Sequence, residues 1–183
     1  MNWNMTHVYF LFAFVVFVVL LELILLGFWN KTFCSVGVPI FFKKFAFVDS
    51  GKVLAKTEGL VNSFGDEKGF KDLTGKKAED NLFFFRVRMD RKGSGFFHGS
   101  IRLDFENRIL SLKCFIGFSE LVFYLGFVFM YLVFFREMGV AVIFLCMIFV
   151  SNIGVDLWKC RKIAKKIEEL LCEAEKSTHS AAN

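Results

Sequence analysis

The sequence predicts a membrane protein of the α+β class: three transmembrane helices, a small antiparallel β domain between spans 1 and 2, and a C-terminal amphipathic helix. Of its 183 residues 55% are hydrophobic, with 27 Phe and a single Pro. The apolar residues form three long runs, each about the twenty residues that a helix needs to cross a bilayer. Between the first two runs, apolar and polar residues alternate with the period of a β-strand.

The first predicted transmembrane helix covers residues 8–29 and follows an external N-terminus, residues 1–7. Its apolar run holds one charged side chain, Glu22, and closes on Trp29, a residue type that favours the membrane interface. Residues 1–7 contain no Lys or Arg, and no small-residue cleavage site follows the run. We therefore expect a retained helix and not a cleaved signal peptide.

The second and third predicted transmembrane helices form a hairpin. They cover residues 114–135 and 140–158, and an external turn at residues 136–139 joins them. Because four residues are too few to hold a domain, the two helices are expected to be antiparallel neighbours. The segments on either side of the hairpin then lie on the same side of the membrane.

The distribution of basic residues predicts the orientation. Of the 23 Lys and Arg residues, 16 lie in residues 30–113 and six in residues 159–183, whereas the N-terminus has none and the 136–139 turn has one. Basic residues accumulate on the cytoplasmic side of membrane proteins. The prediction is a multi-pass protein of the plasma or inner membrane, with its N-terminus outside and its C-terminus in the cytoplasm.

Residues 30–113 are predicted to form the cytoplasmic β domain. Strict alternation in residues 97–105 indicates a half-buried strand, and strands at residues 81–89 and 108–114 are expected to pair with it in an antiparallel meander. A further strand is predicted at residues 39–48. Residues 52–60 are a candidate partner for that strand, and residues 61–80, rich in Gly, Lys and Asp, are expected to form a loop.

The C-terminal segment is predicted to be an amphipathic helix at residues 159–176 that continues the third span. Its apolar residues recur at helical spacing. We expect this stripe to pack on the chain's own sheet and not on a second chain, because about two heptads make only a marginal coiled coil. Residues 177–183 are expected to be a disordered tail.

The formal charge of +5 is interpreted as a basic contact surface of the cytoplasmic parts and not as a nucleic-acid site. One interpretation is contact with anionic lipid head groups or with a protein partner, which includes a second copy of the chain. The other is a solvated face that only follows the charge bias of membrane proteins. The residues of this surface are Arg86, Arg88, Arg102, Arg108, Lys113, Lys159, Arg161, Lys162, Lys165 and Lys166.

A polar cluster is predicted inside the membrane spans. Glu22, Glu120 and Asn152 fall at similar depths, roughly 10–14 Å from the cytoplasmic boundary. Two carboxylates without a basic partner should not both ionise there. In the alternative, each Glu reaches toward water and only orients its helix. The remaining members of the predicted cluster are Ser119, Ser151 and Tyr124.

The sequence contains no signature of an enzyme. It has no P-loop, GxSxG, HExxH or GxGxxG motif, and His98 is expected to be an ordinary surface side chain of its strand. The five cysteines are widely spaced without a CxxC pair, so neither a metal site nor a disulfide framework is expected. We expect no catalytic residues and no cofactor. The predicted function is a non-catalytic binding, assembly or regulatory module, and the alternative is a small transport or proton-coupling component that uses the carboxylates of the spans.

Overall fold

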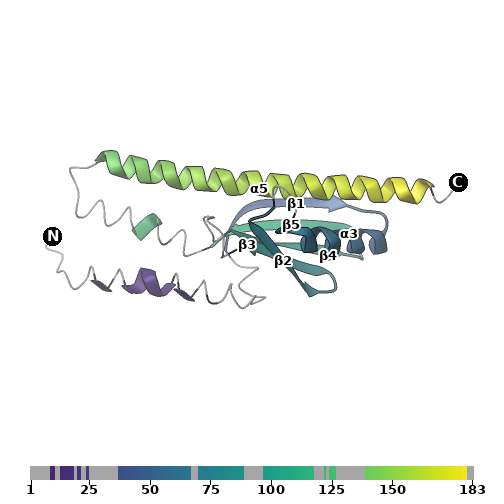
Figure 1. The fold of residues 1–183 in the computed structure, drawn as a ribbon, viewed down its shortest axis with the longest axis horizontal. Helices are drawn as coiled ribbons and strands as arrows, with labels where there is room; N and C mark the ends of the chain where they lie inside the picture. Colours follow the sequence, from purple (N-terminus) through teal and green to yellow (C-terminus); the bar gives the residue numbers. More distant parts are fainter. Residues whose placement is uncertain are drawn as a thin grey trace.

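A five-stranded antiparallel sheet, with helices α3 (Ser50–Ser63) and α5 (Gly139–Ser180) against one of its faces, forms the centre of the structure (Figure 1). This computed structural model describes residues 9–10, 13–18, 20–21, 24, 37–66, 70–88, 97–117, 122, 124–126 and 139–180. We call the face covered by the helices the inner face and the opposite one the open face.

The strands lie side by side in the order β1-β5-β4-β3-β2. The meander predicted from the alternating pattern is confirmed as β3–β4–β5, and the strand predicted at residues 39–48 is confirmed as β1, which pairs with β5. The bounds are β1 Val38–Ala46, β2 Leu73–Glu79, β3 Leu82–Val87, β4 His98–Asp104 and β5 Ile109–Ile116.

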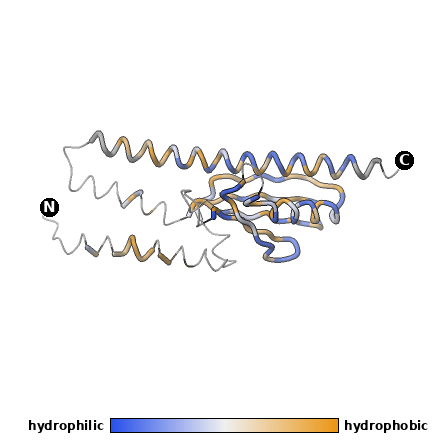
Figure 2. The backbone as a smooth tube through the Cα atoms, viewed as in Figure 1, coloured by the Kyte–Doolittle hydropathy of each residue, from blue (hydrophilic) through white to orange (hydrophobic). Residues whose placement is uncertain are grey.

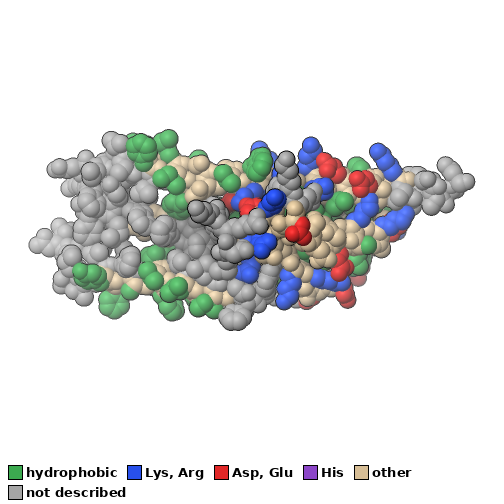
Figure 3. Space-filling view, in the orientation of Figure 1, with side chains coloured by type: hydrophobic (Ala, Val, Ile, Leu, Met, Phe, Trp, Pro, Cys, Tyr) green, Lys and Arg blue, Asp and Glu red, His purple; other side chains and the backbone are tan. Residues whose placement is uncertain are grey.

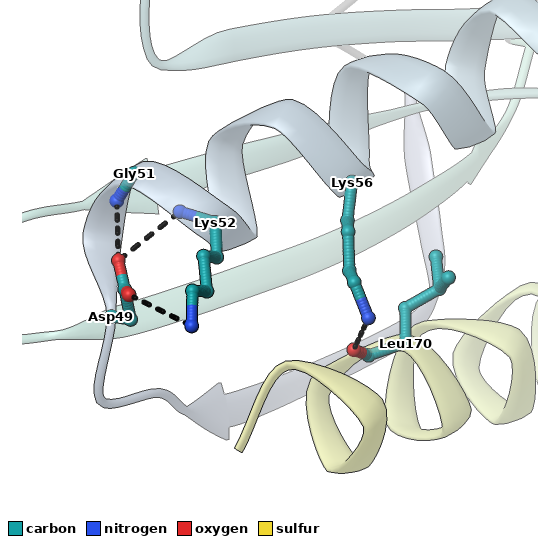
Figure 4. A network of polar contacts seen from close by, with 5 residues as sticks. All are labelled: Asp49, Gly51, Lys52, Lys56 and Leu170. Carbon is teal, nitrogen blue, oxygen red and sulfur yellow. Dashed lines mark hydrogen bonds and ion pairs between the residues drawn. The ribbon is translucent and has the colours of Figure 1, made fainter. Parts of the chain in front are cut away.

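Residues 52–60 are not a strand, which corrects the prediction for this segment. They belong to helix α3, Ser50–Ser63, which Asp49 caps: its Oδ1 accepts hydrogen bonds from the backbone N–H groups of Gly51 at 3.0 Å and Lys52 at 3.1 Å (Figure 4). The capping carboxylate satisfies two of the N–H groups that a helix start leaves without intrahelical partners. The helix then buries one side on the sheet, through Val53, Thr57, Leu60 and Val61.

The loop predicted at residues 61–80 is also corrected, because the last third of this segment forms β2. As an edge strand, β2 buries only Leu73 and leaves Lys76 and Lys77 exposed, so its sequence lacks the alternation of a half-buried strand. Gly75 lets α3 approach closely. A Cβ atom there would lie 2.3 Å from Cγ1 and 2.8 Å from the carbonyl oxygen of Val61.

Helix α5, Gly139–Ser180, has 42 residues, and its second half packs on the inner face of the sheet (Figure 1). The apolar stripe at Cys160, Ile163, Ile167, Leu171 and Ala174 is buried there, so it packs on the chain's own sheet as expected. Exposed ion pairs join the helix to β1 and α3. Their Nζ to carboxylate distances are 2.5 Å for Lys43–Glu168 and 3.3 Å for Lys56–Glu173.

The two halves of α5 differ in polarity. Residues in its first half are mainly hydrophobic and those in its second half mainly hydrophilic (Figure 2). In the space-filling view, exposed hydrophobic side chains gather at one end of the molecule and charged side chains at the other (Figure 3). Ile143, Phe144, Met147 and Val150 are among the exposed hydrophobic side chains of the first half.

No helix within the described residues combines the length and the apolar character that crossing a bilayer requires. The predictions of transmembrane helices at residues 8–29, 114–135 and 140–158, and of a multi-pass plasma or inner membrane protein, are therefore wrong. Residues 1–7 and 136–138, which were predicted to be external, lie outside the described residues. An apolar run shows only that a helix has a suitable composition, and the third run starts a longer helix whose Asp156 is buried in the chain's own packing.

Candidate binding site on the open face of the sheet

A groove of about 410 Å³ lies on the open face of the sheet and is lined by residues from all five strands. Neighbouring side chains on a strand point to opposite faces, so the strands that bury apolar residues beneath α3 and α5 present another set of residues here. The lining residues are Phe42, Lys44, Glu79, Leu82, Phe84, Ser100, Arg102, Ser111, Lys113 and Phe115.

The strand register arranges these side chains in rows across the sheet. Residues directly opposite each other on antiparallel strands have Cβ atoms about 4.5–5.5 Å apart. The first row runs Lys44, Ser111, Arg102, Leu82 and Glu79, from β1 to β2.

The second row runs Phe42, Lys113, Ser100 and Phe84, from β1 to β3. Phe42 is 53% exposed, and its ring lies near two ammonium groups: the Nζ atoms of Lys44 and Lys113 are each 5.6 Å from the ring centroid. Cation–π attraction of this kind contributes about 0.5–1 kcal/mol at an exposed site and restricts the positions of both lysines.

Charge is distributed unevenly along the groove. Lys44, Lys113 and Arg102 lie on the neighbouring strands β1, β5 and β4. At the far end, on β2, the lining residue Glu79 carries the opposite charge, and the exposed Lys76 lies nearby, opposite Phe84. The ion pairs made within the described ranges use other lysines, such as Lys43 and Lys56. The floor is apolar, since Phe84 is 1% exposed and Phe115 is 7% exposed. The arrangement therefore suits a ligand that has negative charge at one end and an apolar part beside it.

His98 lies at one end of the open face and is fully buried, so the expectation of a surface side chain is wrong. Its ring stacks on Phe115 with centroids 5.7 Å apart, and its cross-strand neighbours are Phe115 and Arg86. The position of His98 in its own strand does not predict this burial, because the burial comes from side chains on the two neighbouring strands.

A second cluster lies where α5 meets the chain just before β2. Asp156 is 0% exposed, and its Oδ1 is 3.9 Å from Nζ of Lys159, which in turn is 2.7 Å from Oδ2 of Asp72. Burial, together with the negative charge of Asp72 and against the effect of Lys159, raises the pKa of Asp156 to about 6. Neither carboxylate oxygen of Asp156 has a hydrogen-bond donor within the described structure.

Two buried cysteines lie next to this cluster. The thiols of Cys114 on β5 and Cys160 on α5 are in hydrogen-bond contact, and this contact together with burial raises the pKa of Cys114. A buried protonated thiol is a poor nucleophile and a poor metal ligand. In the part of the chain that the structure describes, no three His, Cys, Asp or Glu side chains are grouped so that they could hold a metal ion.

The structure separates the predicted basic contact surface into two groups on opposite sides of the sheet. Of its members on the strands, Arg102 and Lys113 line the groove. Arg86 is half-buried one row away, opposite His98. Arg88 lies against the turn that follows α3, because a Cβ at Gly65 would be 3.0 Å from its guanidinium. Arg108 lies in the β4–β5 turn, where its φ of 52° is in the left-handed region.

The basic residues of α5 lie on the other side of the sheet from the groove. Lys159 binds Asp72, and Nζ of Lys162 lies 5.3 Å from the ring centroid of Phe70 and 5.1 Å from that of Trp158. Arg161 and Lys165 are exposed, and Lys166 is half-buried. These side chains cannot act on one ligand together with those of the groove.

Only one contact of the predicted polar cluster falls among the described residues. Asn152 Nδ2 donates a hydrogen bond of 2.5 Å to the hydroxyl of Tyr124, whose ring packs on Phe149 with centroids 4.5 Å apart. Ser151 is exposed on α5. The predictions for Glu22, Glu120 and Ser119 lie outside the described residues.

Sequence reasoning missed Lys44, Asp72 and Asp156. The pair Lys43-Lys44 in a strand places one lysine on each face, and a bulge between Pro39 and Phe41 shifts the register. The signal for Asp156 was available, since it is an acidic residue within an apolar run, three positions before Lys159. Nothing in the sequence near Asp72 indicates its contact with α5.

Known proteins provide no analogy for this site. A scan against protein-family models finds no match, and neither does a search of curated proteins or a search of solved structures. Function is therefore inferred from the groove and its chemistry.

Proposed function

We propose that the chain is a non-catalytic binding module that recognises an acidic partner protein with the open face of its sheet. The observation that supports this most directly is the convergence of Lys44, Arg102 and Lys113, from three neighbouring strands, at the rim of one groove. Arg and aromatic side chains are enriched at protein interfaces, and complementary charge increases both association rate and specificity.

The distribution of charge favours a protein over a nucleic acid as the partner. A nucleic-acid surface is usually a continuous basic patch or stripe on one face. Here the basic residues lie on opposite sides of the sheet, and Glu79 closes one end of the groove. On the α5 side, acidic residues such as Glu168 and Glu173 are interleaved with the lysines.

The test compares two triple variants of the full-length chain that change the net charge equally. Lys44→Glu/Arg102→Glu/Lys113→Glu reverses the charge of the groove. Arg161→Glu/Lys165→Glu/Lys176→Glu reverses three exposed residues on α5, away from it. Proteins captured by each variant from the native extract are compared with those captured by the wild type.

We expect the groove variant to lose its specific partner and the α5 variant to retain it. Thermal unfolding of both variants verifies that they fold. Equal capture by all three proteins, or equal loss in both variants, would contradict the proposal, because the open face would then have no special role.

A further inference from the structure

We infer that the groove binds an extended acidic segment of the partner, with its carboxylates at the β1–β5–β4 end and a large aromatic or aliphatic side chain over the apolar floor. This inference rests on the proposed function and names the partner's recognition element. It follows from the charge, the floor and the length of the groove.

The cationic end determines where the acidic residues lie. Lys44 and Arg102 occupy the same row with Ser111 between them, and Lys113 lies in the next row. Three cations on adjacent strands exceed what one carboxylate requires, so the segment carries two or more acidic residues together. At the β2 end the exposed Lys76 offsets the charge of Glu79, so this end attracts an acidic residue less strongly than the three cations on β1, β5 and β4 do. The carboxylates are therefore grouped at one end of the segment.

The apolar floor determines what lies next to them. Phe84 and Phe115 are buried below the rim, and Phe42 presents about half of its surface beside Lys44 and Lys113. Burial of apolar area contributes about 25 cal/mol per Å², so a purely acidic segment would leave this part of the binding energy unused. Since Phe84 and Phe115 have almost no free surface, a neighbouring aromatic or aliphatic side chain of the segment would gain its burial against the exposed ring of Phe42.

The length of the groove favours an extended peptide over a compact anion. The lining residues reach from β1 to β2, across the four spacings between five strands. At about 4.8 Å per spacing this is about 19 Å, the length of about six extended residues. The volume of about 410 Å³ holds side chains of such a segment while its backbone stays near the rim. A single free phosphate or carboxylate would fill only a small part of it.

The experiment measures fluorescence anisotropy of four labelled eight-residue peptides with the full-length protein. The first peptide has three acidic residues followed by Phe and Leu, and the second replaces Phe and Leu with Ala. The third replaces the acidic residues with Gln and Asn, and the fourth reverses the order of the first. We expect the first to bind at least about tenfold more tightly than each of the others. Its affinity should fall as salt rises, because exposed charges are then screened.

Two matched pairs of protein variants assign the binding to the groove. Lys113→Gln and Phe42→Ala should each weaken the first peptide several-fold, whereas Lys165→Gln and Val48→Ala, at exposed positions outside the groove, should leave it unchanged. All four are surface substitutions, and thermal unfolding verifies the fold of each. Equal weakening by the control variants would contradict the assignment to the groove.

The other outcomes separate this inference from the proposed function. If the purely acidic peptide binds as tightly as the first, the apolar anchor is wrong, although an acidic partner remains supported. If no peptide binds while the groove variant still loses its protein partner, the partner presents a folded surface and not a segment. If millimolar inorganic phosphate displaces the first peptide completely at constant ionic strength, the groove is a site for a small anion, and the inference is wrong.

Discussion

The two faces of the sheet are made by alternate residues of the same strands, yet they differ in almost every physical property. On the inner face Ile101, Leu103 and Leu112 are fully buried beneath the helices. On the open face the intervening residues include Arg102, Ser111 and Lys113, which line the groove. The helices cover the inner face, whereas the open face carries the exposed cations around a few buried rings such as Phe84. Substitutions of the buried inner residues and of the exposed open-face residues should therefore have separate effects.

The largest effect is expected from a matched pair of phenylalanines. Phe85 is fully buried on the inner face, with ring centroids 5.9 Å from those of both Phe64 and Phe97. Phe85→Ala should lower the free energy of unfolding by about 3–5 kcal/mol, because it leaves a cavity. Phe42→Ala, on the open face, should lower it by less than about 1 kcal/mol. Urea unfolding measures the free energy of unfolding of both variants. Similar losses of stability in the two would contradict the distinction between the faces.

Asp156, the one carboxylate that is fully buried in the described structure, makes the stability of the fold depend on pH. The pKa of Asp156 is about 6 in the folded state against 3.8 ordinarily, so burying its charge destabilises the fold above pH 6. This cost is relieved as the pH falls from about 6 to about 4, because the folded state then takes up the proton first. Asp156→Asn should therefore stabilise the fold at pH 7 by on the order of 2 kcal/mol, and hardly at pH 4.

Urea unfolding of the wild type and Asp156→Asn at pH 7 and pH 4 tests this sign. Asp66→Asn, at an exposed carboxylate, is the control and should change stability little at either pH. A variant that is less stable than the wild type at pH 7 would show that attraction to Lys159 outweighs the cost of burial.

Two glycines test how tightly α3 covers the inner face. Gly75→Ala should destabilise the protein by about 1–2 kcal/mol, because its Cβ would lie 2.3 Å from Val61 Cγ1. Gly59→Ala, within α3, has nothing within 4 Å of its Cβ and should stabilise by about 0.5–1 kcal/mol through helix propensity. Opposite shifts of the melting temperature are expected, and a shared sign would mean that α3 does not pack on β2 at Gly75.

The smallest effect concerns the start of α3. Asp49→Ala removes the side chain that accepts two backbone hydrogen bonds, and should cost about 1 kcal/mol. Asp80→Ala removes a carboxylate that is 97% exposed, in the turn before β3, and should cost less than about 0.5 kcal/mol. Thermal unfolding distinguishes the two, and peptide binding to the groove should be unchanged in both, since they lie outside it.

The sequence was sufficient to predict β1, β3, β4 and β5, because half-buried strands alternate and the turns between them are polar. It was not sufficient for α3 or β2. Helix α3 begins at a capping aspartate, and β2 is an edge strand that forms by pairing with β3. The pattern of hydrophobic residues indicates neither feature. The predicted spans rested on apolar composition alone, and no helix within the described residues has both the length and the apolar character that a span requires.

The candidate site was only partly predictable. The sequence predicts Arg102 and Lys113 as parts of a basic contact surface, but it groups them with residues of α5 that lie on the other side of the sheet. Assigning a charged residue to a face requires the register of its strand, and the bulge in β1 made that register unreadable for Lys44. Asp156 interrupts an apolar run as Glu22 and Glu120 do, but its burial depends on contacts between α5 and the rest of the fold that the sequence does not show.

The pairing of β1 with β5 has a consequence for how the chain folds during synthesis. β1 is made first among the strands, but its partner residues, Ile109–Ile116, follow more than sixty positions later, and α5 later still. At about 5–20 residues per second, β1 spends several seconds with an unpaired edge rich in Phe. Contacts between residues so distant in sequence also slow folding, because the entropy cost of closing a long loop comes before the stabilising contacts form. We therefore expect the nascent chain to need protection from aggregation until β5 emerges, and the sheet to close late.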